Sequence, residues 1–243
     1  MTRIVRRPIS AVEHEGPSSR DRHANLRTRR AAERPTRVMP PRAADAPPPP
    51  ASDPFQSFWM AGFESACHIN AKDLRVDMIA ATQHDTLAHE DYARLPKHGF
   101  LVARDSVRWH LIDRHGRFDF SSLAPQALAA KHAGVQVIWN LMHYGLPDGL
   151  GVLSPDFVER FTNFCRAVAC FFSSLSSDVP IYAPINEISF LTWSMGDGLT
   201  MQPHYAGRGW DIKRELVRAV IAGMDAIWEV DPRARFVHTD PII

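Results

Sequence analysis

Short apolar runs alternate with amphipathic stretches along the chain from Phe55 onward. The apolar runs predict five strands, at residues 58–65, 99–107, 135–143, 179–187 and 234–240. Each run is followed by a loop rich in polar residues. Alternation of this kind is typical of βα units built around a parallel sheet, so the pattern predicts an α/β fold.

The stretches between the strands have readable helix ends. The segment "SPDFVERFTNFCRAVACFF" begins with Ser154 as the expected N-cap and places a row of phenylalanines on one face. In "SSLAPQALAAKHAG", Ser121 or Ser122 is the expected N-cap and Gly134 the C-terminal stop. A third helix is expected over about residues 210–230. The sequence therefore predicts at least three crossover helices.

Composition divides the chain at about residue 54. Residues 1–54 are rich in arginine and proline, contain no lysine and end in "APPPPASDP". We expect this arm to be disordered, because it cannot bury enough apolar surface to offset its chain entropy. Its arginine pairs would suit a nucleic-acid or anionic-surface tether, but they lack interleaved aromatics, so a solvated tail and no nucleic-acid partner are expected. Residues 55–243 form the expected folded domain.

Charge and cysteine usage restrict the cellular context. The chain of 243 residues has a formal net charge of +1 and no apolar run approaching the length of a membrane span. Its three cysteines, Cys67, Cys165 and Cys170, lack metal-ligand spacing and are odd in number, which suits a reducing compartment. A cytoplasmic protein without a membrane partner is expected.

Polar residues recur at the ends of the predicted strands. In a barrel of βα units, the side chains that do chemistry lie at the C-terminal ends of the strands, where the following loops form the open face. These positions hold, in chain order, Glu64, Arg104, His143 with Tyr144, Asn186 with Glu187, and His238 with Asp240. The repetition of polar groups in register indicates a functional site.

Several segments resemble one known family. "RDSVRW" is similar to the Arg-x-Ser-x-x-Trp second strand of family 1 glycoside hydrolases, and "LMHYGLPDGL" to their third-strand His-Trp-x-Leu-Pro segment. "INE" resembles their acid/base Asn-Glu, and "HEDYARLPKHGF" the helix before the second strand. The resemblance implies a β-glucosidase-like (β/α)8 TIM barrel that is incomplete here, with about the first five βα units.

The resemblance also implies roles for the strand-end residues. Glu187 would be the acid/base of a retaining O-glycosidase acting on β-linked sugars, without a cofactor or a metal. The implied carbohydrate-binding residues are Asn186, His143, Tyr144, Glu64, Arg104 and Trp193. Tyr144 replaces the family's tryptophan, Ile188 its proline, and Glu64 stands near its sugar-binding glutamine, so the sugar remains open. Trp193 is open between a sugar platform and a packing residue, whereas Trp109, Trp139 and Trp228 are expected in the core.

The nucleophile of that family has no counterpart in this chain. It lies at the end of the seventh strand, whereas the sequence ends after the fifth predicted strand. Asp240 is a poor substitute, because it lies on the strand next to Glu187 rather than across the barrel. The alternatives are a non-catalytic carbohydrate-binding remnant and, less well supported, a metal-dependent hydrolase on the same type of barrel, suggested by the twelve histidines.

An incomplete barrel would expose sheet edges and part of its interior layer. The interior candidates on the five strands are Phe58, Met60, Ile138, Ile181, Ile185 and Val237. Their exposure would leave an apolar patch larger than soluble monomers usually carry. Self-association, or a separate polypeptide that completes the barrel, is therefore expected.

Overall fold

Five parallel strands form the main sheet of the computed structural model, which describes residues 54–241. The strands are β1 (Met60–Gly62), β2 (Val102–Ser106), β5 (Gln136–Met142), β6 (Ile181–Ile185) and β7 (Arg235–Phe236). They lie in the order β1-β2-β5-β6-β7, so each strand pairs with the next one along the chain. This confirms the predicted α/β class and matches the strand order of an incomplete barrel. The strands are shorter than predicted, most of all at the two edges.

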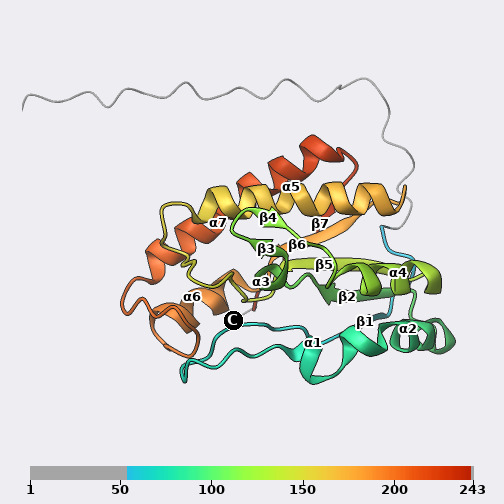
Figure 1. The fold of residues 1–243 in the computed structure, drawn as a ribbon, viewed down its shortest axis with the longest axis horizontal. Helices are drawn as coiled ribbons and strands as arrows, with labels where there is room; N and C mark the ends of the chain where they lie inside the picture. The colour runs from blue at the N-terminus through green and yellow to red at the C-terminus, as the bar shows by residue number, and fades with distance from the viewer. Residues whose placement is uncertain (1–53, 242–243) are drawn as a thin grey trace, which may run out of the picture. The chain divides into compact units, whose positions relative to one another are not determined.

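Helices connect these strands and pack against the sheet. They are α1 (Met78–Ala81), α2 (His84–Arg94), the 3-10 turn η1 (Pro96–His98), α3 (Trp109–Ile112), α4 (Ala124–Ala133), α5 (Phe157–Leu175), α6 (Ile188–Gly196) and α7 (Gly209–Val230). A small antiparallel pair, β3 (Asp113–Arg114) and β4 (Arg117–Phe118), follows α3. In Figure 1, α5 and α7 run side by side above the sheet, and α1 and α2 lie below it.

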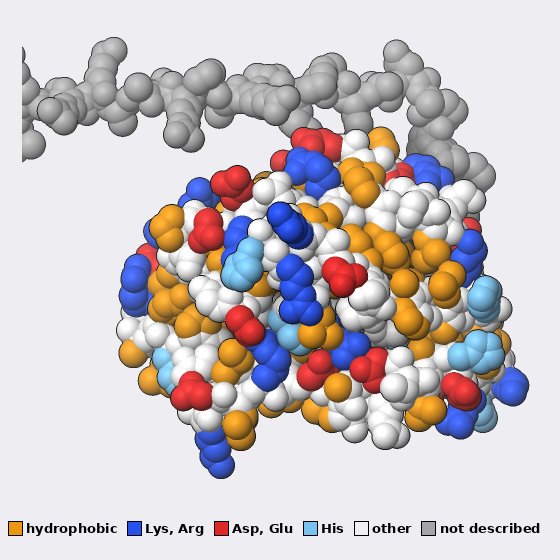
Figure 2. All heavy atoms as spheres, viewed as in Figure 1, with side chains coloured by type: hydrophobic (Ala, Val, Ile, Leu, Met, Phe, Trp, Pro, Cys, Tyr) orange, Lys and Arg blue, Asp and Glu red, His pale blue; other side chains and the backbone are white. Residues whose placement is uncertain are grey.

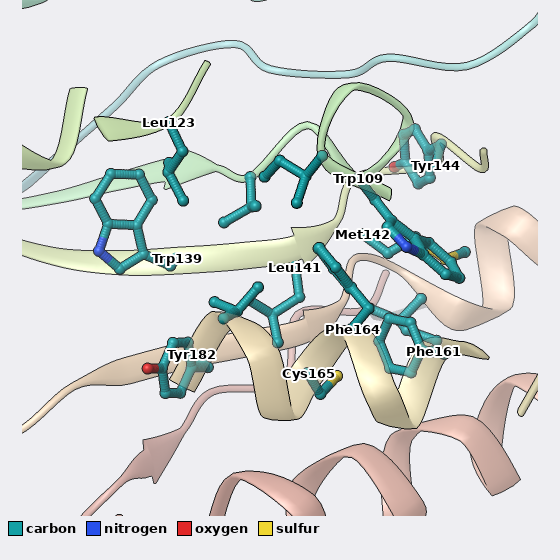
Figure 3. Packing of buried hydrophobic residues seen from close by; sticks show 14 of the residues in the cluster. Trp109, Leu123, Trp139, Leu141, Met142, Tyr144, Phe161, Phe164, Cys165 and Tyr182 are labelled. Carbon is teal, nitrogen blue, oxygen red and sulfur yellow. The ribbon is translucent and has the colours of Figure 1, made fainter. Parts of the chain in front are cut away.

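The main core lies between the sheet and its helices. Trp109 is fully buried and packs on three phenylalanines of α5, with its ring stacked on Phe164 at a centroid distance of 5.1 Å. Figure 3 shows Trp109, Phe161, Phe164 and Met142 packed together at one end of this cluster. Trp139 is also buried, as predicted, whereas Trp228 is only half-buried. The phenylalanine row seen in the sequence is therefore the surface by which α5 packs on the sheet.

The opposite face of the sheet carries a second, smaller apolar cluster. Val102, Ile138, Ile181 and Ala183 come from three neighbouring strands and are all buried, with Phe55 and Val237 packed against them. The expectation that Ile138, Ile181 and Ile185 would be exposed is wrong, because Ile138 and Ile181 are buried in this cluster with Phe55 packed against it, and Ile185 is buried in the main core.

Exposed apolar side chains gather instead at the outer edge strand. Phe58 is 87% exposed and Trp59 is 71% exposed, directly before β1. Met60 of β1 is also exposed. Elsewhere, apolar side chains are interspersed with charges of both signs on the face drawn in Figure 2. Self-association through an edge therefore stays a prediction, with β1 as its apolar edge.

Two predicted helix starts are wrong. Helix α5 begins at Phe157, because the Ser154 hydroxyl accepts a hydrogen bond from the Gly151 N–H in the preceding turn and does not cap the helix. Helix α4 begins at Ala124, after Leu123, and neither Ser121 nor Ser122 caps it. The predicted stop at Gly134 is confirmed, since this glycine ends α4 with a φ of 67°.

A buried polar cluster joins β2 to helices α2 and α4. The carboxylate of Asp105 accepts hydrogen bonds from Tyr92 Oη at 2.8 Å, His84 Nε2 at 3.1 Å and Gln126 Nε2 at 3.2 Å. The other ring nitrogen of His84 lies 2.8 Å from Asp91 Oδ2. Because Asp105 lies between Arg104 and Ser106, this cluster fixes the part of β2 that supplies both residues to the opposite face.

The predicted arm at residues 1–54 lies almost wholly outside the described residues. None of the helices within residues 54–241 is long and apolar enough to cross a lipid bilayer. In the same part of the chain, no group of three or more His, Cys, Asp or Glu side chains is arranged to hold a metal ion.

Candidate functional site at the C-terminal ends of the strands

The strand-end residues of β5 and β6 lie next to each other. Met142 pairs with Ile185 at the ends of these strands, and the Asn186 N–H donates to the Met142 carbonyl at 3.0 Å. The Glu187 N–H donates to the Thr239 carbonyl at 2.9 Å, which extends the pairing toward β7. Sheet register therefore brings His143, Tyr144, Asn186 and Glu187 together, as the sequence predicts.

A directed chain of hydrogen bonds runs through these residues from a cation to a carboxylate. Arg104 Nη2 donates to Asn186 Oδ1 at 2.6 Å, and Thr239 Oγ1 donates to the same oxygen at 2.8 Å. Asn186 Nδ2 then donates to Tyr144 Oη at 2.8 Å, and Tyr144 Oη donates to Glu187 Oε2. The guanidinium can only donate and the carboxylate can only accept, so every bond between them has one direction.

Arg104 belongs to β2 itself and not to the loop after it. It lies in the middle of β2, paired with Gly62 and Ile138, and its long side chain reaches up to Asn186. Its carbohydrate-binding role stays a prediction, and in the structure its guanidinium holds the amide of Asn186.

Tyr144 and Glu187 share an uncommon backbone conformation. Their φ angles are 69° and 49°, in the left-handed region that side chains other than glycine adopt seldom. Such positions cost about 1–3 kcal/mol each and concentrate at functional sites. Burial, together with the hydrogen bond to Glu187 and its charge, raises the pKa of the Tyr144 hydroxyl well above its usual value. Tyr144 therefore stays protonated and remains a donor to Glu187.

His143 lies on the other side of Tyr144, and its ring is in edge contact with the tyrosine at a centroid distance of 4.8 Å. The imidazole is buried, and Nδ1 lies 2.9 Å from Ser65 Oγ. Burial and the nearby Arg104 charge lower the pKa of His143 to about 4, against the opposing charge of Glu64. His143 is therefore neutral near pH 7.

The two other acids at strand ends are engaged elsewhere. Glu64 is exposed, and its Oε1 accepts from the backbone N–H groups of Ser65 and Ala66 at 3.1 and 3.0 Å. Asp240 accepts from the Ser189 N–H at 3.0 Å and from its hydroxyl at 2.7 Å. Ser189 is in the first turn of α6, so Asp240 caps that helix. His238, the remaining strand-end candidate, is exposed.

Aromatic rings continue outward from Tyr144. The Tyr144 and Phe190 rings lie 5.6 Å apart, and Phe190 and Trp193 lie 5.8 Å apart. Trp193 is 48% exposed, so it is a surface residue of α6 and not part of the core. The sequence left its place open, and the structure puts it at the outer end of this aromatic row.

A cavity of about 350 Å³ lies beside Tyr144. Its walls include Arg75, Leu146, Gln202 and Tyr205, from three loops on the same side of the sheet as the strand ends. A second cavity, of about 300 Å³, lies between α4 and α5 and has none of the strand-end residues in its lining. The first cavity is therefore the one relevant to the candidate site.

Sequence reasoning missed three residues of the site: Ser65, Asn140 and Thr239. Asn140 carried a usable signal, since it is a lone amide within the apolar run "VQVIWNLMH" and is fully buried. A buried amide in a strand requires hydrogen-bond partners. Thr239 and Ser65 carried no such signal, because small hydroxyl residues are common at strand ends.

Comparison with known proteins supports the fold at this point. No family model matches the chain, and no curated protein does. Among solved structures, the chain is similar to the family 1 β-glucosidase from Thermotoga maritima in complex with isofagomine lactam, with 17% identity and a TM-score of 0.57 over 64% of this chain and 37% of that one.

Two further solved structures are similar to this chain over part of its length. The AHE enzyme from Alicyclobacillus herbarius matches with 17% identity and a TM-score of 0.57, over 63% of this chain and 36% of that one. The β-glycosidase BGL167 matches with 21% identity and a TM-score of 0.53, over 65% of this chain and 45% of that one. The chain thus spans less than half the length of these proteins. It has a glycoside hydrolase-like fold, with similarity to TIM-barrel glycosidases over part of its length.

Proposed function

We propose that residues 54–241 carry the acid/base half of a retaining β-glycosidase site, with Glu187 as the acid/base. The observation that carries this proposal is the hydrogen-bond chain from Arg104 through Asn186 and Tyr144 to Glu187. It lies at the C-terminal ends of strands in a glycosidase-like fold, where enzymes of this architecture bind substrate.

The chemistry gives these residues distinct tasks. An acid/base carboxyl must protonate the leaving-group oxygen while positive charge develops at the anomeric carbon. Tyr144 holds Glu187 Oε2, which leaves Oε1 to face that oxygen. His143, Asn186 and Glu64 would contact sugar hydroxyls, and the exposed Trp193 would contact the sugar or its aglycone.

We further propose that the nucleophile is not supplied by the described residues. A retaining reaction needs a second carboxylate about 5 Å from the first. Glu64 is bonded to its own turn and Asp240 to the start of α6, so neither is free to attack. The second candidate function, a non-catalytic carbohydrate-binding protein, is favoured by this same observation.

A small external nucleophile tests the proposal. With a 4-nitrophenyl β-glycoside and azide, azide would attack the anomeric carbon, so that the C–N bond forms as the C–O bond breaks. Glu187 would give its proton to the departing phenolate oxygen, and the product would be an α-glycosyl azide. We expect release of nitrophenol with azide only, and loss of that release in Glu187→Gln but not in Asp240→Asn.

The other outcomes are informative. In the absence of azide, we expect Glu187→Gln to change little. If nitrophenol is released without azide and Glu187→Gln abolishes that release, the chain holds its own nucleophile and the site is not incomplete. Sugar binding without release in azide would favour the non-catalytic function. If a panel of β-glycosides shows no binding and no nitrophenol release, that result would contradict a carbohydrate site.

A further inference from the structure

Four buried polar side chains form a second hydrogen-bond chain, separate from the one that ends at Glu187. Asn140 Nδ2 donates to Ser106 Oγ at 3.1 Å, Ser106 Oγ lies 2.6 Å from Ser65 Oγ, and Ser65 Oγ lies 2.9 Å from His143 Nδ1. Ser65, Ser106 and Asn140 have no exposed surface, and His143 is 6% exposed. The chain crosses three elements, from β5 through β2 to the segment after β1.

With Asn140 Nδ2 facing Ser106, the hydrogens of this chain point toward His143. Asn140 Nδ2 can only donate, so Ser106 Oγ accepts from it and must send its own hydrogen elsewhere. Its acceptors are Ser65 Oγ at 2.6 Å and His143 Nδ1 at 3.4 Å, and Ser65, once it accepts from Ser106, donates its own hydrogen to His143 Nδ1. The reverse direction would leave the Ser106 hydrogen pointing at an amide nitrogen that cannot accept it.

The direction of the chain sets the tautomer of His143. A neutral imidazole has one N–H and one acceptor nitrogen, so acceptance at Nδ1 places the hydrogen on Nε2. A charged imidazolium would carry hydrogens on both nitrogens and would reverse the bond to Ser65. Burial and the charge of Arg104 disfavour that form as well.

We propose that Ser65, Ser106 and Asn140 are positioning residues that hold His143 as the neutral Nε2–H tautomer, so that it presents a hydrogen-bond donor to a ligand oxygen. The ligand part of this inference rests on the proposed carbohydrate site. The ligand group that this donor selects is a sugar hydroxyl whose oxygen accepts a hydrogen bond from His143 Nε2–H.

The tautomer can be read directly in long-range 1H–15N spectra of the 15N-histidine-labelled chain, with His143 assigned by loss of its signals in His143→Gln. We expect a protonated Nε2 and an unprotonated Nδ1 at pH 7. Asn140→Asp replaces the donor with a near-isosteric acceptor, so it should reverse the chain and move the hydrogen to Nδ1. Asn163→Asp, at an exposed position of α5, is the matched control and should leave the His143 signals unchanged.

Ser65→Ala provides a second variant, which removes the nearer hydroxyl at Nδ1 and leaves only Ser106 Oγ, at 3.4 Å. We expect a mixture of both tautomers, whereas Ser194→Ala, which removes a buried serine hydroxyl in α6 outside this chain, should give the wild-type pattern. An Nδ1–H or mixed tautomer in the wild type would overturn the proposal, as would an unchanged tautomer in a folded Asn140→Asp variant.

Sugar titration tests the ligand role separately. Glucose derivatives that carry hydrogen or fluorine in place of each hydroxyl should reveal one position where removal of oxygen weakens binding roughly three- to tenfold, the size of one hydrogen bond. Fluorine should restore part of the loss, because it accepts but does not donate. In Ser65→Ala that discrimination should shrink. If the tautomer is Nε2–H but no single sugar hydroxyl matters for binding, the ligand role alone is overturned. If no sugar binds at all, the result counts against the proposed function.

Discussion

Asp105→Ala is expected to lower the free energy of unfolding by about 3–5 kcal/mol, the range for breaking a buried charged network. Asp105 has no exposed surface, and its carboxylate accepts from Tyr92, His84 and Gln126 as well as from the Ser106 N–H at 2.7 Å. Removing it leaves these buried donors without their acceptor, and each unsatisfied group carries a desolvation cost. Urea denaturation measures the loss, and Asp119→Ala, at an exposed turn, should show a much smaller one.

The loss should depend on pH with a definite sign. Burial alone would lower the pKa of His84, but the hydrogen bonds and charges of Asp105 and Asp91 outweigh it and raise that pKa above its ordinary value. The stability that depends on charged His84 is therefore fully present below the unfolded-state pKa of about 6.5 and disappears as pH rises through the folded-state pKa. The cost of Asp105→Ala should be larger at pH 6 than at pH 9. An equal cost at both pH values would mean that His84 is not charged in the folded state.

Gly145→Ala is expected to destabilise the chain by about 3 kcal/mol, at the upper end for overpacking. A Cβ at this position would lie 2.3 Å from the carbonyl oxygen of Cys67 and 2.4 Å from its Sγ. The segment after β5 must then move away from Cys67, whose N–H donates to the His143 carbonyl at 3.1 Å. Because Tyr144 lies between His143 and Gly145, its bond to Glu187 should be lost as well.

Gly62→Ala is the matched control for this prediction. Gly62 is exposed, and a Cβ there would meet nothing within 4 Å. Thermal unfolding of the two variants should show a large loss of stability for Gly145→Ala and little change for Gly62→Ala. Similar losses in both would show that the contact with Cys67 relaxes without cost.

The strand pattern was predictable because buried parallel strands are continuous apolar runs. The run that became β5 is paired on both sides and was located to within one residue at each end. The runs around the other four strands were predicted several residues too long, most of all at the edge strands β1 and β7. Apolar sequence does not show how far pairing extends, least of all where a strand has a neighbour on one side only.

Local signals failed where hydroxyl groups had more than one available partner. Ser154 fits the N-cap preference, yet its hydroxyl is used by Gly151 three residues earlier, and α5 begins later. N-cap propensity ranks serine as a good cap, but it does not show which backbone N–H, that of the preceding turn or that of the helix, the hydroxyl will accept from.

The candidate site was predictable in its membership but not in its bonding. Parallel register brings the ends of β5 and β6 together, so His143, Tyr144, Asn186 and Glu187 were foreseeable neighbours. The contact of Arg104 with Asn186, and the bond of Tyr144 to Glu187, depend on side-chain length and on the left-handed backbone at Tyr144 and Glu187. These features are not expressed in a polarity pattern.

Calorimetric titration with a cationic iminosugar, 1-deoxynojirimycin, beside neutral glucose tests the central claim that these strand ends form a glycosidase-type carbohydrate site. The cation mimics the positive charge of the transition state, which Glu187 would face. We expect tighter binding of the iminosugar than of glucose, with that preference lost in Glu187→Gln and kept in Asp240→Asn. Failure of both ligands to bind, or an iminosugar preference that survives Glu187→Gln, would contradict a glycosidase-type site at these strand ends.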